Sequence, residues 1–253
     1  AFAASFADTD DDGDLDLVTG NFGLNTRFTA SPEAPFSCYA KDFDNNGTLD
    51  PIVTLYEGKN NFPLVQKEVM VKQMPSLKKK YLYAEVYSQT TIEKMWGSGL
   101  KDALQLRAYD LETCWWDNQG GKFVRRSLPR QAQISAVQGI LVNDFNGDGK
   151  LDFAASANSN GWVRVFTGDA AGIFTNTDTE NLGVGVRGNA VGDINGDNKL
   201  DLINANPGTQ AIYIMLGNVD GTLQAPTTIS FGTLAPSEVQ LADMNGDSVL
   251  DIL

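Results

Sequence analysis

Short apolar stretches alternate with turn-forming residues along this chain, a pattern that predicts strands rather than long helices. Residues 162–166 and 212–216 alternate or run apolar over a few positions beside Gly-containing turns, as the strands of hairpins do. Short apolar segments also flank acidic loops, as at residues 140–142 and 202–203. One such repeat supplies about four short strands, the content of one blade of a β-propeller.

Two landmarks recur about every 50 residues. An acidic loop begins at Asp144, Asp193 and Asp243, with spacings of 49 and 50 residues. Hairpin turns keep the same step at residues 117–123, 168–174 and 217–223. This period is typical of propellers and other repeat arrays. We therefore predict an all-β fold in which residues 1–253 form about five four-stranded blades of a β-propeller, either closed as a five-bladed ring or part of a larger one.

The second predicted blade is longer than the regular ones. In those, the hairpin turn begins 24 residues after the loop's first aspartate, whereas Asp42 and Asp117 lie 75 residues apart. Residues 57–107 change to a helical pattern, in which Thr90 and Glu93 form a capping box. We predict a single propeller domain over the whole chain, with residues 57–107 as a helical insertion.

Five nine-residue loops carry oxygen-bearing side chains at positions 1, 3, 5 and 9. We call them the first to fifth acidic loops: residues 8–16, 42–50, 144–152, 193–201 and 243–251. These side chains, with the backbone carbonyl of position 7, can surround a hard cation that takes about six to eight oxygen ligands. We therefore predict up to five Ca²⁺ sites. Their ligands are Asp8, Asp10, Asp12, Asp14 and Asp16; Asp42, Asp44, Asn46, Thr48 and Asp50; Asp144, Asn146, Asp148, Lys150 and Asp152; Asp193, Asn195, Asp197, Lys199 and Asp201; and Asp243, Asn245, Asp247, Val249 and Asp251.

Position 6 of each loop must fold the backbone around the ion. Gly13, Gly47 and Gly149 permit the left-handed conformation, while the last two loops have Asn198 and Ser248. Serine adopts positive φ less readily than asparagine, so the fifth site should be the weakest. Magnesium suits an all-protein cage poorly, and no loop has the glutamate that an EF-hand places at position 12. A single acidic loop of this kind could be a solvated turn that binds no metal, but five copies with the same spacing disfavour that interpretation.

The charge of the chain follows from these loops. They hold 18 of its 32 acidic residues, and five divalent ions would reduce the net charge of −13 to about −3. Without metal, the carboxylates of the first loop would raise one another's pKa, so we predict that calcium binding and folding are coupled. The sequence contains no histidine, which excludes Ser-His-Asp and Cys-His catalysis and histidine-ligated zinc.

Other composition features give weaker predictions. Cys38 and Cys114 could form a disulfide if their strands are neighbours, or remain two buried thiols. No apolar run approaches the ~20 residues of a membrane span. The sequence starts at Ala1 without an initiator Met or a signal-like segment, so we expect a processed or excised chain.

The acidic loops at this interval resemble the FG-GAP/VCBS repeat family, known from integrin α-subunit propellers and many secreted bacterial and fungal proteins. Residues 15–155 resemble, more narrowly, VCBS proteins that carry an ASPIC/UnbV domain, although that segment itself is not in this chain. The motifs are Gly20-Asn-Phe-Gly-Leu-Asn25, Ala30-Ser-Pro-Glu-Ala-Pro35, Asp42-Phe-Asp-Asn-Asn-Gly47, Lys72-Gln-Met-Pro-Ser-Leu-Lys-Lys-Lys80, and Leu128-Pro129 followed by Gln133. The resemblance implies calcium-binding loops on blade edges and an adhesion or recognition role without a reaction.

Aromatic and basic residues supply candidate ligand sites. Trp96, Trp115, Trp116 and Trp162 are either core residues of the blades or a platform for stacking sugars. The run at residues 78–80 consists of lysines and is either a solvated face or a dock for an acidic partner.

Carboxylates near the tryptophans leave an enzymatic alternative open. Tyr109, Asp110 and Glu112 could serve a polysaccharide lyase or hydrolase if their groups converged. We instead predict a secreted or cell-surface, calcium-stabilised module without a catalytic centre that recognises a polysaccharide or protein. A structural subunit of an extracellular filament or surface layer, formed by self-association, is the second hypothesis. We expect no nucleic-acid partner for a chain this acidic.

Overall fold

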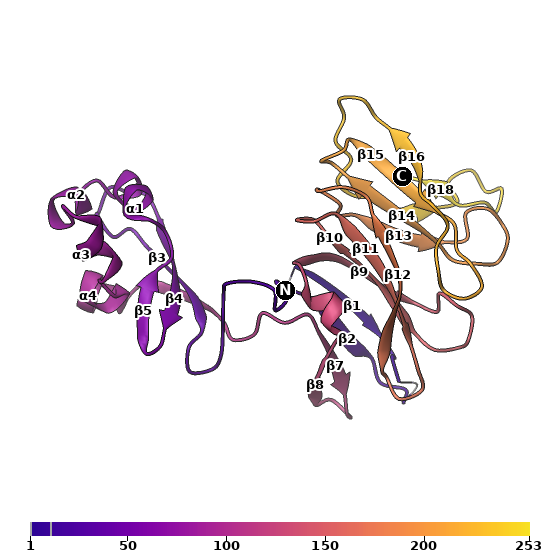
Figure 1. Ribbon diagram of the computed structural model, residues 1–253, viewed down its shortest axis with the longest axis horizontal. Helices are drawn as coiled ribbons and strands as arrows, with labels where there is room; N and C mark the ends of the chain where they lie inside the picture. Colours follow the sequence, from indigo (N-terminus) through magenta and orange to yellow (C-terminus); the bar gives the residue numbers. More distant parts are fainter. Residues whose placement is uncertain (1, 11) are drawn as a thin grey trace. The chain divides into compact units, whose positions relative to one another are not determined.

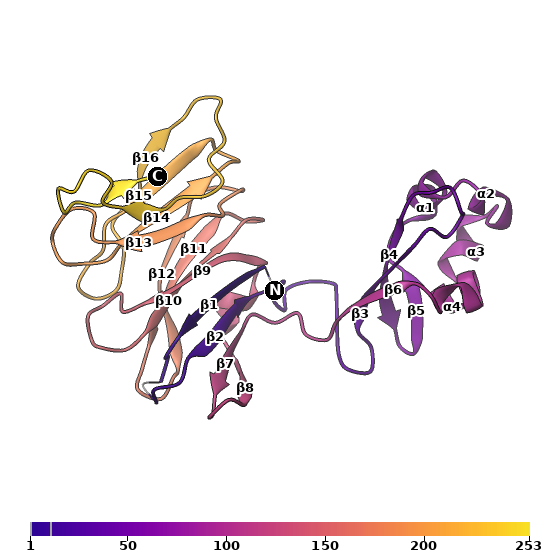
Figure 2. The same cartoon turned by 180° about the vertical axis from the view of Figure 1, so that it is seen from behind.

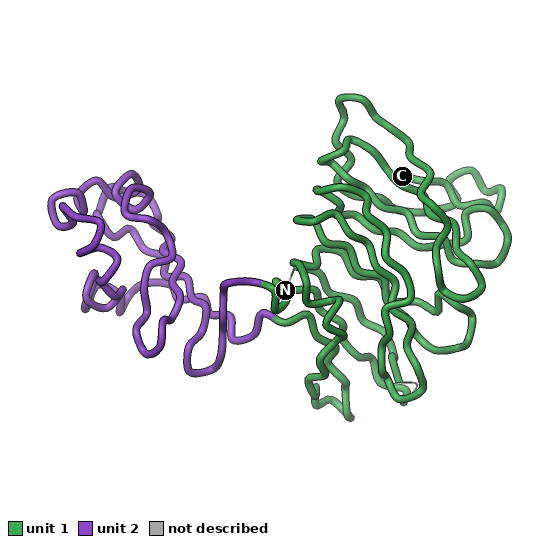
Figure 3. Tube along the Cα trace, in the orientation of Figure 1, with its two compact units in different colours: residues 1–25, 112–253 green, residues 26–111 purple. Residues whose placement is uncertain are grey.

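The computed structural model describes residues 2–10 and 12–253 and divides the chain into two compact units. Unit 1 consists of Ala1–Asn25 and Glu112–Leu253, and unit 2 of Thr26–Leu111 (Figure 3). The helical insertion predicted at residues 57–107 lies within unit 2, which also has a sheet of its own.

Unit 1 is a series of antiparallel sheets (Figures 1 and 2). The strand orders are β1-β2-β7-β8, β9 to β12, β13 to β16, and the pair β17-β18. The strands are β1 Ala3–Ala7, β2 Asp16–Gly20, β7 Cys114–Asn118, β8 Phe123–Ser127, β9 Val137–Asn143, β10 Asp152–Ala157, β11 Trp162–Gly168, β12 Phe174–Asn181, β13 Asn189–Gly192, β14 Asp201–Asn206, β15 Ala211–Met215, β16 Thr227–Ser230, β17 Leu241–Ala242 and β18 Asp251–Ile252, with a 3₁₀ turn at Arg130–Gln133. The predicted four-stranded, antiparallel β architecture is confirmed, and the described sheets do not close into a ring.

The hairpin turn at residues 117–123 belongs to the first of these sheets. It joins β7 to β8, and β7 pairs with β2, so that Val18 lies opposite Trp115. We predicted this turn in the blade of the second acidic loop, and that prediction is wrong. Unit 2, which contains the second loop, is inserted between β2 and β7, so the distance along the chain from Asp42 counted a separately folded unit.

The core of unit 1 lies between consecutive sheets. Every residue of β10 and β14 is buried, because neighbouring sheets cover both of their faces. Phe153 and Phe166 are fully buried cross-strand partners whose rings stack at 4.4 Å, and Trp115 of the first sheet belongs to the same cluster. A second cluster joins Val163 of β11 to Leu202 of β14. Each sheet is therefore stabilised by its neighbours rather than by a core of its own.

Unit 2 combines a four-stranded sheet with short helices. Its strand order is β5-β4-β3-β6, so the strand that comes last in the chain pairs with β3 rather than β5. Tyr39 and Ile52 of the sheet pack with Met70, Met74 and Ile92 of the helical segment. The elements are β3 Phe36–Lys41, β4 Asp50–Glu57, β5 Asn60–Pro63, α1 Lys67–Gln73, α2 Leu77–Lys80, α3 Ala84–Ser88, α4 Ile92–Trp96, a 3₁₀ turn at Gly97–Leu100, and β6 Leu104–Ala108.

Helix α4 begins one residue later than predicted. Thr91 is its N-cap, and its hydroxyl oxygen accepts a hydrogen bond from the N–H of Lys94 at 3.3 Å. The hydroxyl of Thr90 instead donates to the carbonyl of Val86 at 2.6 Å. The predicted capping box of Thr90 and Glu93 is therefore wrong in register, because both threonines are cap formers and only tertiary packing selects between them.

Two further sequence questions are answered by the fold. Cys38 in β3 and Cys114 in β7 are not joined in a disulfide, and Cys114 is buried. Among the described residues, none of the helices has the length and apolar character needed to cross a membrane.

Candidate metal-binding loops

The acidic loops share one hydrogen-bond pattern, which the third loop illustrates. Asp144 at position 1 accepts backbone N–H bonds from Gly147 at 2.7 Å, Asp148 at 3.2 Å and Gly149 at 2.9 Å. Asp148 at position 5 accepts from the N–H of Lys150 at 2.8 Å. The bonds from positions 5 and 6 recur at Asp8, Asp42, Asp193 and Asp243. The bond from position 4 recurs at Asp193 and Asp243. The carboxylates at positions 1 and 5 are thus held by the loop's own backbone.

The residues at position 7, predicted to offer their carbonyls, follow the same pattern. Their backbone N–H groups donate to the position-5 side chain at 2.7–3.0 Å. They are Asp14, Thr48, Lys150, Lys199 and Val249.

The aspartate at position 9 joins the third loop to another element. Asp152, which is fully buried, accepts one bond from the N–H of Phe145 and one from the N–H of Gly168, both at 2.8 Å. Gly168 begins the hairpin turn after β11, so this carboxylate ties the loop to the hairpin. Burial raises the pKa of Asp152 to about 6, although these two bonds lower it.

The equivalent aspartates differ mainly in their second donor. Asp16 accepts from Asn118 and Asp201 from Gly217, in each case through a backbone N–H at a hairpin. Asp50 in unit 2 accepts instead from the side-chain amide of Gln73, at 3.3 Å. Asp251 accepts from the N–H of Met244, which is position 2 of its own loop.

Position 6 is left-handed in every loop, as predicted. Its φ is 93° at Gly13, 85° at Gly47, 82° at Gly149, 62° at Asn198 and 68° at Ser248. Position 4 is also left-handed where it is described, which sequence reasoning missed; position 4 of the first loop lies outside the described residues. Those position-4 residues are Asn45, Gly147, Gly196 and Gly246. Glycine or asparagine recurs at both positions because each needs positive φ.

Alanine in place of Gly149 should destabilise the third loop. A Cβ there would meet no atom within 4 Å, so its cost is purely conformational and should lower the free energy of unfolding by about 1 kcal/mol. Urea unfolding would measure this change. Ser248→Gly is the matched opposite change and should not destabilise the protein. Equal stability losses in the two variants would contradict this assignment of backbone strain.

The first two loops concentrate negative charge. The carboxylates of Asp8, Asp10 and Asp12 offer oxygens within 4.8 Å of one another, and Asp42, Asp44 and Asp50 do the same. This clustering and the chemistry of the donors suit a hard cation.

Position 3 gives the more specific observation. One oxygen of Asp10 and one of Asp44 are buried without a hydrogen-bond partner in the described structure. Burial raises the pKa of Asp10, as do the carboxylates of Asp16, Asp12 and Asp117. A buried, unpaired carboxylate oxygen is costly unless a cation or proton satisfies it. The residues of these two loops therefore fit a hard divalent cation.

The last three loops carry less unsatisfied charge at position 3, and in the third and fourth loops a side chain also donates to the position-5 aspartate. Position 3 is asparagine, and in the third loop the amide of Asn146 donates to Asp148 at 3.0 Å. In the fourth loop the ammonium of Lys199 donates to Asp197 at 2.6 Å, and this bond lowers the pKa of Asp197. These side chains compete with a cation for the same oxygens, so the first two loops fit one better.

The candidate sugar-binding tryptophans are mainly packing residues. Trp162 is 4% exposed and Trp115 is 5% exposed, which leaves neither ring a free face for a sugar. Trp116 is half-buried, and its indole N–H donates to the hydroxyl of Thr19 at 3.2 Å. Trp96 stacks on Phe43 with ring centroids 4.5 Å apart.

Two of the candidate catalytic groups, Tyr109 and Glu112, have different environments. Glu112 is bonded to the guanidinium of Arg125. Tyr109 is 49% exposed.

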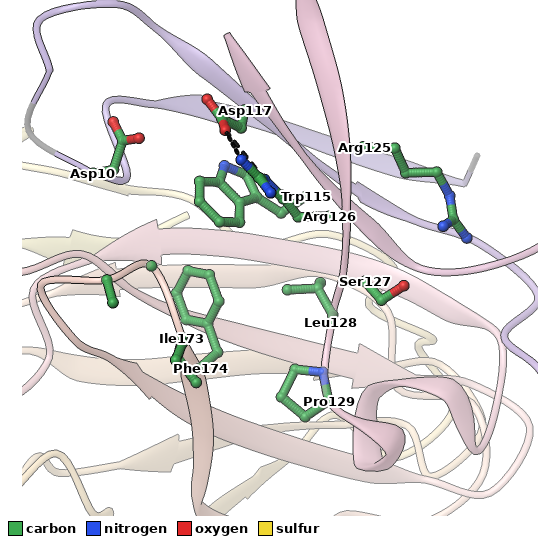
Figure 4. A pocket seen from close by; sticks show the side chains of 12 residues that line it. Asp10, Trp115, Asp117, Arg125, Arg126, Ser127, Leu128, Pro129, Ile173 and Phe174 are labelled. Carbon is green, nitrogen blue, oxygen red and sulfur yellow. Dashed lines mark hydrogen bonds and ion pairs between the residues drawn. The ribbon is translucent and has the colours of Figure 1, made fainter. Parts of the chain in front are cut away.

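A cavity of about 700 Å³ lies beside the first loop (Figure 4). Asp10, Trp115 and Phe174 are among its lining residues. Asp117 is 4% exposed and accepts bonds from Arg126 at 2.8 and 3.2 Å. Sequence reasoning missed the arginine, although Arg126 lies opposite Trp115 in the predicted hairpin. Two aspartates and two arginines line the cavity, so its lining has no net charge that would favour a ligand of one sign.

Comparisons with known proteins bear on the repeats. Residues 144–203 and 193–253 each match the family model described as FG-GAP-like repeat. Residues 144–253, which are less than half of the chain, are therefore similar to FG-GAP-like repeats. They contain the third, fourth and fifth acidic loops, so the FG-GAP resemblance is supported in this part of the chain. No curated protein matches the sequence.

One similar solved structure is the Tc holotoxin pore of Photorhabdus luminescens. The sequence identity is 17% and the TM-score 0.32, over 98% of this chain and 10% of the matched chain. The chain therefore spans about a tenth of that protein's length. A similarity of this degree shows neither a shared fold nor a shared function.

Proposed function

We propose that this chain is a calcium-stabilised, non-catalytic recognition or adhesion module that binds a polysaccharide or a protein. The observation that carries the calcium assignment is the buried, unpaired carboxylate oxygen at position 3 of the first two loops. Because the same hydrogen-bond pattern recurs in the other loops, we extend the calcium assignment to all five, with a lower affinity for calcium in the last three.

Calcium would act on the fold rather than on a reaction. In the first, third and fourth loops the position-9 aspartate joins the loop to a hairpin of the same sheet. A cation that holds the loop would therefore also hold the hairpin, and loops on a rigid scaffold make good recognition surfaces. We further propose that the sheets of unit 1 are adjacent blades of a propeller.

An extracellular location fits the expected affinity. Extracellular calcium modules bind the ion with Kd of about 10⁻⁴ to 10⁻³ M, a concentration found outside the cytosol. The proposal accordingly includes secretion or display at the cell surface.

Calcium titration of paired variants tests the metal assignment. Asp10→Asn with Asp44→Asn removes a carboxylate from each of the two best-fitting loops, so isothermal titration calorimetry should show the tightest sites weakened by at least about tenfold. The control is Asp102→Asn, an exposed aspartate of unit 2 outside the loops, which should titrate like the unchanged chain. Wild-type affinity in the double variant would contradict the assignment.

A further inference from the structure

Unit 2 contains a groove built from two adjoining cavities. One has a volume of about 500 Å³ and the other about 470 Å³. Lys67 and Glu68, in the first turn of α1, line both. The two cavities are therefore parts of one surface feature, which we call the α1 groove.

Part of the larger cavity is an apolar socket, next to the charged residues Glu57, Lys67 and Glu68. Phe62 and Val65 line it, and so does Tyr87, which is 5% exposed. The hydroxyl of Tyr87 donates to the carbonyl of Val65 at 2.8 Å. Because this hydrogen bond satisfies the phenol, the socket can accept an apolar side chain without leaving the phenol unpaired.

The smaller cavity is basic around an apolar wall. Lys67, Lys72 and Lys78 line it with Glu68, a net charge of +2, and Leu82 lies beside them with 70% of its surface exposed. Lys67 is anchored through its ammonium to the carbonyl of Leu82 at 3.1 Å. Lys72 and Lys78 are exposed, and their side-chain ammonium groups form no hydrogen bond or ion pair with any described residue.

The lysines of the α1 groove lie in the part of the chain that is not acidic. Unit 2 holds 11 of the 19 basic residues and 10 of the 32 acidic ones, a net charge of +1, whereas the rest of the chain has −14. An anionic partner would therefore be repelled by most of this protein but attracted to the α1 groove.

The geometry points to an acidic peptide segment with an apolar anchor as the occupant of the α1 groove. Its carboxylates would contact Lys72 and Lys78, and its apolar side chain would enter the socket at Phe62 and Val65. A lipid surface is less suited, because a flat interface cannot fill two cavities. An anionic polysaccharide is less suited, because it has no apolar side chain to enter the socket at Phe62 and Val65.

This inference narrows the partner class of the proposed recognition function to protein. Fluorescence anisotropy of a labelled synthetic peptide, glutamate-rich with a leucine at every third position, tests it on the full chain. Lys72→Glu with Lys78→Glu should weaken binding by at least about tenfold. Lys59→Glu with Lys101→Glu is the matched control, because both lysines are exposed in unit 2 but neither lines the groove. The control should retain wild-type affinity.

Further experiments distinguish a specific peptide site from non-specific attraction and from a membrane-binding surface. A peptide with serine in place of leucine should bind at least about tenfold more weakly, since the socket would stay empty. Equal binding of the serine peptide, or equal losses in both lysine pairs, would overturn the inference in favour of non-specific attraction. Binding of phosphatidylserine vesicles but not of the peptide would overturn it in favour of a membrane. If the peptide binds but calcium does not change the stability of the protein, the peptide-binding role of the α1 groove stands and the proposed calcium-stabilised function fails.

Discussion

Removing calcium with EGTA should lower the free energy of unfolding by several kilocalories per mole. A site that binds only the folded state adds about 1.4 kcal/mol at free calcium about ten times its Kd, and four of the five loops lie in unit 1. The carboxylates crowded in the first loop add repulsion once the ion is gone, as the raised pKa of Asp10 indicates. Urea unfolding in calcium and in EGTA at matched ionic strength measures the difference.

Controls distinguish ion capture from general screening. Replacing calcium by magnesium should restore only part of the stability, because magnesium demands a strict octahedron and dehydrates reluctantly. The double variant Asp10→Asn with Asp44→Asn should lose part of the calcium response. A urea midpoint that is the same in calcium and EGTA would reject the coupling of calcium to folding.

Replacing Phe153 with alanine should cost about 3–5 kcal/mol of stability. The ring is fully buried, stacks on Phe166 and packs edge-on against Phe174, in a cluster that also contains Trp115 of the preceding sheet. Removing the ring leaves a cavity between two sheets. This cavity can close only if both sheets move. Thermal and urea unfolding would both report the effect.

The matched control is Phe123→Ala. Phe123 lies in β8 and is 46% exposed, so its truncation should cost far less than that of Phe153. Similar losses in the two variants would show that the sheets do not depend on the packing between them.

Local patterns predicted the repeated elements well. Glycine, asparagine and serine at position 6 required positive φ, and the structure has it in all five loops. The turns at residues 168–174 and 217–223 were predicted as hairpins, because their strands alternate locally, and the first of them joins β11 to β12.

Pairings between distant segments could not be predicted in this way. Spacing from Asp42 suggested that the turn at residues 117–123 followed the second loop, but β7 pairs with β2, which precedes unit 2. The insertion predicted at residues 57–107 lies inside a unit that spans Thr26–Leu111, because β3, β4 and β6 form a sheet with its own core. The hydrogen bond from the N–H of Gly168 to Asp152 also depends on which hairpin lies next to each acidic loop. No local pattern encodes these choices.

The pairing of β2 with β7 has a consequence for folding during synthesis. Thr19 and Cys114 are partners although they lie 95 residues apart, so β2 leaves the ribosome long before the strand that completes its sheet. Until then its open edge is available to wrong partners. Early folding of Thr26–Leu111 would shorten the effective loop between β2 and β7. It would therefore reduce the conformational entropy that is lost when the two strands pair. The inserted unit could thus act as a folding aid for the sheet that it interrupts.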